Sequence, residues 1–129
     1  MSAEVRSATP RPHKRNYPRA PISIRVRYGE PITTPKEGFT GTMGGGGVFI
    51  ETVHPSLPVG TGIVLEFSLP CKTGHIQVEG LVVWVRPEFD PNGLAPGMGI
   101  QFKKISDWDR EKILDLVMRI LMGKPEVDV

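Results

Sequence analysis

The sequence of 129 residues predicts an all-β domain with a terminal helix, in which about six antiparallel strands form a small barrel or sandwich. Short segments of alternating apolar and polar residues, separated by glycine- and proline-containing turns, run from Ile22 to Lys103. One segment with helical periodicity follows, from Ser106 to Met122. The chain length fits a single domain.

The first three strands are expected in the first half of the chain. Every second residue is apolar from Ile22 to Tyr28, which indicates a strand with one buried face. A shorter strand is expected at Gly38–Met43 and a third at Val48–Thr52, where β-forming residues follow one another. The four glycines Gly44–Gly47 lie between them and predict a tight hairpin turn with positive φ angles.

The next strands form a long hairpin and one return strand. Alternation at Ile63–Leu69 and again from His75 to Arg86 indicates two strands, separated by a turn at residues 70–74. The run after Gly80 is apolar on both faces, so a bulge or a barrel corner is expected at this glycine. The last strand is expected at Gly97–Lys103.

One helix is expected to close the domain. Ser106 and Asp109 have the spacing of a capping box, and Gly123 marks the end of the helix. The apolar residues between them are more numerous than one core-facing stripe requires. Two alternatives stay open: the helix is buried on most sides, or part of it contacts a second subunit or a partner through Leu114, Met118 or Met122.

Composition excludes several classes of protein. No apolar run reaches the roughly 18 residues of a membrane span, and no secretory signal is evident, so we expect a cytoplasmic protein without membrane insertion. Cys71 is the single cysteine and the three histidines are scattered, which leaves no ligand set for a structural metal. We therefore expect no metal and no bound cofactor, and Cys71 is interpreted as an inert turn residue.

A basic arm precedes the first strand. The first 20 residues hold five basic side chains and one acidic one, whereas the other 109 residues hold 11 basic and 13 acidic side chains. Prolines 18 and 21 favour an extended path for this arm. Arg15 and Arg19 are four residues apart on it, and a guanidinium can hold phosphate oxygens with two bonds and stack on a base. The arm therefore predicts an anionic, nucleotide-like ligand.

No arrangement of residues indicates catalysis. Carboxylates are scattered along the strands, no serine lies in a nucleophile-elbow sequence, and the histidines have no motif partners. The glycine run leads into Val48 and a strand, so it lacks the Gly-Lys-Ser/Thr sequence and the helix of a nucleotide-hydrolase loop. We expect a protein that is not an enzyme.

The arm, the glycine turn and the terminal helix together resemble the PilZ domain, a bacterial module whose family role is binding cyclic di-GMP. The resemblance covers roughly Lys14 to Met122 and implies a six-stranded antiparallel PilZ-type β-barrel plus a C-terminal α-helix. Residues 1–12 lack hydrophobic periodicity and contain two prolines, so we expect a flexible segment there, a PilZ-like domain at residues 13–123 and a short tail at 124–129. The matching segments are the R-x-x-x-R motif at 15–19, the Gly-Gly-x-Phe strand at 46–49, and later strands at 80–84 and 96–102.

The resemblance also implies which residues bind the ligand. In the family both arginines of the first motif hold phosphates and guanines, and these roles map onto Arg15 and Arg19. The second motif, D/N-x-S-x-x-G, falls on residues 42–47, where Gly47 matches. Thr42 occupies the position of the aspartate or asparagine, and Gly44 occupies that of the serine. The ligand-binding residues are thus expected to be Arg15, Arg19, Thr42, Gly44 and Gly47.

Two functions follow from these residues and stay open. The first is a signalling adaptor that binds cyclic di-GMP and passes the signal to a protein partner. The second is a degenerate PilZ-like protein that does not bind the nucleotide and acts through protein contacts, for example in motility regulation. A homodimer through the terminal helix is compatible with both. Nucleic-acid binding ranks below them, because Tyr17 is the only aromatic residue of the basic arm.

Overall fold

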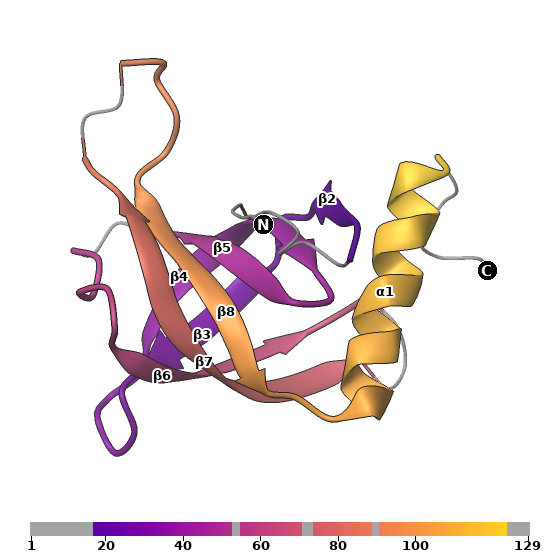
Figure 1. Cartoon of the computed structure of the whole chain (residues 1–129), viewed down its shortest axis with the longest axis horizontal. Helices are drawn as coiled ribbons and strands as arrows, with labels where there is room; N and C mark the ends of the chain where they lie inside the picture. The colour runs from indigo at the N-terminus through magenta and orange to yellow at the C-terminus, as the bar shows by residue number, and fades with distance from the viewer. Residues whose placement is uncertain (1–16, 53–54, 71–73, 89–90, 124–129) are drawn as a thin grey trace, which may run out of the picture.

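The computed structural model shows a small barrel with one helix beside it (Figure 1). The structure describes residues 17–52, 55–70, 74–88 and 91–123. The described strands are β2 (Arg19–Pro21), β3 (Arg25–Gly29), β4 (Lys36–Gly44), β5 (Gly47–Glu51), β6 (Gly62–Ser68), β7 (His75–Arg86) and β8 (Gly97–Lys104). The helix is α1 (Asp107–Leu121).

The six strands β3 to β8 form a closed antiparallel barrel. The pairing order is β4-β3-β6-β7-β8-β5, and β5 pairs with β4 to close the ring. Strand β2 is an addition, which pairs with the end of β4 beyond the stretch that pairs with β3. The predicted fold class, a six-stranded barrel with a terminal helix, is confirmed. The predicted flexible segment and tail lie outside the described residues, and the domain boundaries stay a prediction.

The predicted first strand is interrupted in the structure. Instead of a single strand from Ile22 to Tyr28, the chain forms β2 and β3 with a break at residues 22–24. The break lies opposite Thr40, whose buried hydroxyl accepts a hydrogen bond from the Ile24 N–H at 2.9 Å and donates to the Ile22 carbonyl. The register of β4 also shifts between Thr40 and Thr42. A side chain and a bulge therefore replace the regular ladder here.

The glycine turn is confirmed, but its predicted φ angles are wrong. Gly44 and Gly47 pair across β4 and β5, so Gly45 and Gly46 form a two-residue turn. In the part of the chain that the structure describes, none of the four glycines has a positive φ. Close neighbours explain two of these glycines instead: a Cβ on Gly47 would lie 2.2 Å from the Ile100 carbonyl oxygen, and one on Gly44 would lie 2.8 Å from the Pro18 carbonyl oxygen.

The interior of the barrel is a single apolar core. Inward residues of every barrel strand contribute to it, and Ile50, Leu65 and Met98 are fully buried. The hairpin β6–β7 and the return strand β8 have nearly the predicted bounds. The ladder between β7 and β8 shifts register at Gly80, as predicted, and again after Val82. These shifts bend β7 so that the ring can close.

Helix α1 packs its inner face onto this core. Ser106 caps the helix, since its hydroxyl accepts a hydrogen bond from the Asp109 N–H at 3.0 Å. Ile113, Leu116 and Val117 are buried in the same cluster as the barrel residues. Met118 and Met122 are exposed by 42% and 56%, so the helix is not buried on all sides.

Replacing Ile32 with asparagine is expected to raise the free energy of unfolding by about 1 kcal/mol, because a β-branched residue is strained at positive φ. Ile32 has a φ of 59° and is fully exposed at the third position of the turn Glu30–Thr33. Urea denaturation measures the change. Ile32→Val, which keeps the branched side chain, should match the wild type, and equal stability of the asparagine and valine variants would contradict the explanation.

Candidate functional site

An open groove with a volume of about 820 Å³ runs over the outer surface of β5, β8 and β7. The end of the arm, the glycine turn and the first turns of α1 border it, through Tyr17, Gly46 and Arg110. The strands that carry its floor lie next to each other in the barrel (Figure 1). Segments from both ends of the chain therefore meet at one site.

Two aromatic rings and a glycine form the floor of the groove. Gly99 of β8 pairs with Phe49 of β5 on one side and with Trp84 of β7 on the other. The two rings stack at a centroid distance of 5.1 Å and an interplanar angle of 22°. A Cβ on Gly99 would lie 2.0 Å from Trp84 Nε1, so only glycine lets the indole lie flat on the sheet. Phe49 is 5% exposed, whereas Trp84 is 44% exposed, so part of the indole surface is open to solvent.

Arg86 lies beside these rings. Its guanidinium carbon is 4.5 Å from the centroid of Phe49 and 5.5 Å from that of Trp84, distances typical of cation–π contacts. Arg86 Nη1 donates a hydrogen bond to the Ala95 carbonyl oxygen at 2.9 Å, which ties the side chain to the β7–β8 loop. The guanidinium is thus held in place against the aromatic floor.

Arg19 connects the arm to the second motif. Its Nη2 donates to Thr42 Oγ1 at 3.0 Å, and its Nη1 donates to the Gly47 carbonyl oxygen at 3.4 Å. All three residues line the groove. Arg19 and Gly47 are 28 positions apart in the sequence, and the fold brings these two predicted site residues together with Thr42. Arg15 lies outside the described residues, so its role stays a prediction.

Gly44 does not line the groove. It pairs with Arg19, and a Cβ at this position would lie 2.8 Å from the Pro18 carbonyl oxygen and 2.9 Å from Arg19 Cγ. The added strand β2 thus occupies the space that a serine side chain would need. Gly44 has a structural role in this pairing, and a contact between it and a ligand stays a prediction.

Arg110 brings the helix to the groove. Its Nε donates to the Gly45 carbonyl oxygen at 3.1 Å, and its guanidinium carbon lies 5.3 Å from the ring centroid of Tyr17. Tyr17 in turn lies against the glycine turn, since a Cβ on Gly45 would be 2.9 Å from Tyr17 Cγ. Arg110 therefore holds the end of the arm and the turn together.

The described charged side chains that line the groove are all positive. Arg19, Arg86 and Arg110 are its charged side chains, and none of the described residues that line it is an aspartate or a glutamate. Sequence reasoning found Arg19 but not Trp84, Arg86 or Arg110 as site residues. Trp84-Val85-Arg86 reads as an ordinary strand and Arg110 as a helix surface charge, and only the fold shows that they share a groove.

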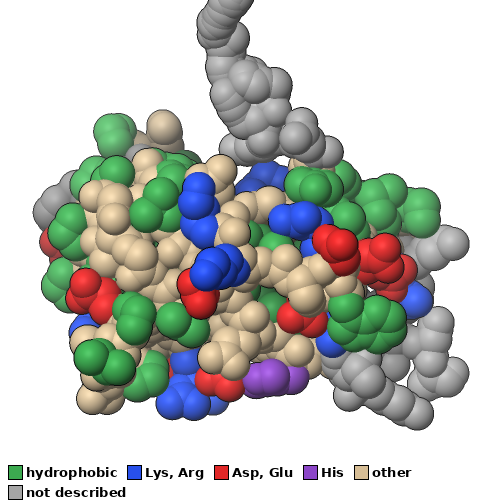
Figure 2. All heavy atoms as spheres, turned by 60° about the horizontal axis from the view of Figure 1, so that its bottom comes forward, with side chains coloured by type: hydrophobic (Ala, Val, Ile, Leu, Met, Phe, Trp, Pro, Cys, Tyr) green, Lys and Arg blue, Asp and Glu red, His purple; other side chains and the backbone are tan. Residues whose placement is uncertain are grey.

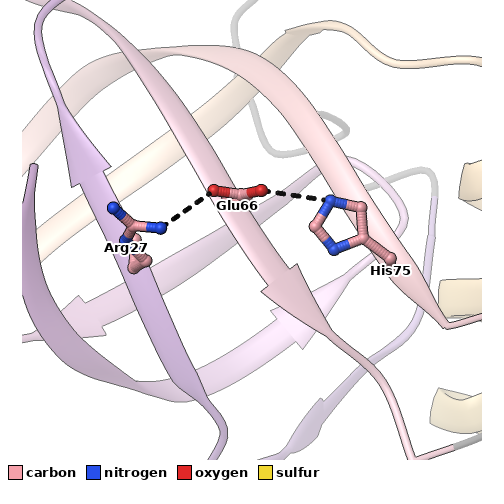
Figure 3. A network of polar contacts seen from close by, with 3 residues as sticks. All are labelled: Arg27, Glu66 and His75. Carbon is pink, nitrogen blue, oxygen red and sulfur yellow. Dashed lines mark ion pairs between the residues drawn. The ribbon is translucent and has the colours of Figure 1, made fainter.

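The face formed by β3, β6 and β7 has a different character. Glu66 lies between Arg27 and His75, with Arg27 Nη1 3.6 Å from Glu66 Oε1 and His75 Nε2 3.2 Å from Glu66 Oε2 (Figure 3). Acidic and basic side chains are interspersed on the face at the bottom of Figure 1 (Figure 2). Exposed pairs of this kind contribute little to stability. This face provides control positions with no expected ligand.

Two kinds of feature are absent from the described part of the chain: a metal-binding cluster and a membrane-spanning helix. Within residues 17–123, apart from the short gaps in the description, no group of three or more histidine, cysteine, aspartate or glutamate residues is arranged to hold a metal ion. Nor does the described part of the chain contain a helix long and apolar enough to span a membrane. The groove itself offers arginines, aromatic rings and backbone groups, which suit an organic anion.

The fold and the groove define a small antiparallel barrel with a positively charged outer groove. The sequence pattern of the PilZ domain matches residues 13–119. The chain therefore belongs to the PilZ domain family, as the sequence resemblance predicted. No curated protein matches the sequence.

Solved structures agree with this fold. The Bacillus subtilis inhibitor of motility MotI/DgrA matches with a TM-score of 0.73 and 20% identity, over 87% of this chain and 53% of that one. The PilZ domain of YcgR from Escherichia coli, solved with cyclic di-GMP, matches with a TM-score of 0.58 and 17% identity, over 87% and 99%. The K. pneumonia MrkH complex with cyclic di-GMP gives 0.65 and 17%, over 84% and 53%. The chain thus spans about half of the motility inhibitor and of MrkH.

Proposed function

We propose that this PilZ domain is a non-catalytic signalling adaptor that binds cyclic di-GMP in the groove and passes the signal to a protein partner. The observation that carries the proposal is the groove itself: three guanidinium groups and an exposed indole line it, without a carboxylate among the described residues. The YcgR and MrkH structures that resemble this fold contain cyclic di-GMP, which supports the choice of ligand.

The chemistry of cyclic di-GMP fits this lining. The ligand has two phosphate groups and two flat guanine bases. Arg19 and Arg110, at the border of the groove, carry permanent charge for the phosphates. The exposed face of Trp84 provides a surface on which a base can stack. Arg15 of the arm would add a fourth guanidinium in the role that the family gives it.

One observation favours the alternative, a degenerate PilZ protein that does not bind the nucleotide. The Thr42 hydroxyl already accepts a hydrogen bond from Arg19, and β2 occupies the space of a serine at position 44. A missing hydrogen bond to a polar ligand costs about 0.5–1.5 kcal/mol, and a factor of ten in affinity is about 1.4 kcal/mol. Two missing bonds weaken binding roughly ten- to hundredfold, which the extra arginines would have to offset.

Isothermal titration of the full chain with cyclic di-GMP decides between the two functions. We expect a Kd in the low-micromolar range that rises with added salt, because opposite charges attract less when screened. GMP, with one base and one phosphate, is the matched control and should bind much more weakly. The absence of heat at millimolar cyclic di-GMP would contradict the proposal and leave the alternative.

The protein partner is proposed to contact α1. Met118, Leu121 and Met122 are exposed on this helix by 42%, 50% and 56%, and Leu114 lies close to them in the helical repeat. A second copy of the chain would fit the same surface as a homodimer. Sedimentation velocity with and without cyclic di-GMP tests the dimer: a concentration-dependent increase in mass supports it, and a monomer at all concentrations leaves the surface to another protein.

A further inference from the structure

We infer that the groove recognises a 6-oxopurine through O6 and N7 of the base, with Arg86 as the reading residue, and that it does not read the 2-amino group of guanine. The inference rests on the proposed nucleotide function and specifies its selectivity. It follows from which hydrogen-bonding groups line the groove, and from how Arg86 is held beside Trp84.

The side chains that line the groove are rich in donors and poor in acceptors. Guanine presents N1–H and a 2-amino group as donors on one edge, and O6 and N7 as acceptors on the other. A carboxylate is the side chain that accepts from both donors of the first edge, and the described lining residues include none. The 16 residues before Tyr17 contain a single carboxylate, Glu4.

Three neutral side chains of the lining carry an acceptor oxygen, those of Tyr17, Thr42 and Gln101, and none of them replaces that carboxylate. The phenol of Tyr17 offers a single oxygen. The hydroxyl of Thr42 already accepts from Arg19 Nη2 at 3.0 Å. Gln101 carries one carbonyl oxygen together with an amino group, so it can accept one bond and not two at the same geometry. The described side chains that line the groove therefore include no carboxylate for the donors of guanine N1 and of its 2-amino group. Glu51 pairs with Gly97 beyond the floor and does not line the groove.

Arg86 supplies donors for the other edge. A guanidinium has five N–H donors, and the bond from Nη1 to Ala95 uses one of them. Its position is constrained on two further sides by Phe49 and Trp84. A base that stacks on the exposed face of Trp84 has one edge beside this guanidinium. Arginine bonded to O6 and N7 of guanine is the commonest specific contact between a side chain and a base.

The hydrogen-bonding groups on the base edge beside Arg86 determine which purines can bind. Hypoxanthine has the same O6 and N7 as guanine but lacks the 2-amino group. Adenine has an amino donor at position 6, which opposes the donors of arginine. The site should therefore accept cyclic di-GMP and cyclic di-IMP alike and reject cyclic di-AMP.

The test compares these three ligands on the full chain by isothermal titration. The Kd values of cyclic di-GMP and cyclic di-IMP are expected to agree within about threefold, since the 2-amino group gains no charged partner. The Kd of cyclic di-AMP is expected to be at least about tenfold higher, which is the discrimination of one good two-bond contact.

Two variants assign the selectivity to Arg86. Arg86→Lys keeps the charge but loses the planar fork, so the preference for cyclic di-GMP over cyclic di-AMP should shrink to within about threefold. Arg27→Lys, on the β3–β6–β7 face, is the matched control and should keep the full preference. Circular dichroism checks that both variants are folded.

The outcomes separate this inference from the proposed function. A Kd for cyclic di-IMP more than tenfold above that for cyclic di-GMP shows that the 2-amino group is read, which overturns the inference and leaves nucleotide binding intact. Equal binding of cyclic di-AMP overturns it as well, as does an unchanged preference in Arg86→Lys. If no ligand binds, the proposed function fails and the inference fails with it.

Discussion

Replacing Gly47 with alanine is expected to lower the free energy of unfolding by about 3 kcal/mol. The new Cβ would lie 2.2 Å from the carbonyl oxygen of Ile100, which belongs to the backbone of the neighbouring strand. Gly47 pairs with Gln101 at this point, so β5 and β8 must separate to make room. Urea denaturation followed by tryptophan fluorescence measures the loss.

Gly62 provides the matched control. It is also a strand glycine, but a Cβ at this position has no heavy atom within 4 Å. Gly62→Ala should leave stability unchanged or raise it by up to about 1 kcal/mol, because alanine restricts the unfolded chain. Equal effects of the two substitutions would show that β5 and β8 do not approach as closely as described.

Replacing Arg19 with alanine is expected to weaken the binding of cyclic di-GMP by roughly ten- to hundredfold, as the loss of a charge-assisted hydrogen bond of about 1.5–3 kcal/mol implies. The substitution removes one of the groove's three described guanidinium groups. It also removes the link between the arm and Thr42. Isothermal titration of the variant beside the wild type measures the change.

Arg27→Ala serves as the control for this loss of charge. Arg27 is an exposed arginine that pairs with Glu66 on another face of the barrel (Figure 3). Its removal changes the net charge by the same amount but should change the Kd by less than about twofold, since exposed charges beyond a Debye length of ~8–10 Å are largely screened. A similar rise of the Kd in both variants would indicate that the net charge of the protein attracts the ligand, and would contradict a binding site at Arg19.

Most of the fold could be predicted from the sequence because its signals are local. Alternation predicted the hairpin β6–β7, and Ser106 predicted the start of α1. The first strand was predicted without its break, because the break depends on the Thr40 side chain of a different strand. The φ angles of the glycine turn were wrong for a similar reason: contacts with Pro18 and Ile100, and not the turn conformation, require the small residues.

The candidate site was less predictable than the fold. Arg19, Thr42 and Gly47 were found through motif spacing, and the structure brings them together. Trp84 and Arg86 carry no local signal for ligand binding, because a strand residue faces a groove only when the neighbouring strand provides space. Gly99 provides this space on β8, and this role depends on its pairing with Trp84 of the adjacent strand β7, which is distant in the sequence.

The indole N–H signals of the two tryptophans offer the most direct test of nucleotide binding in this groove. Trp84 lies on the floor of the groove, whereas Trp108 is exposed on α1 and does not line it. In a 1H–15N NMR titration of the full chain, with signals assigned through Trp108→Phe, cyclic di-GMP should shift the Trp84 indole signal and leave that of Trp108 in place. A saturating titration that moves neither signal, or Trp108 alone, would contradict the account.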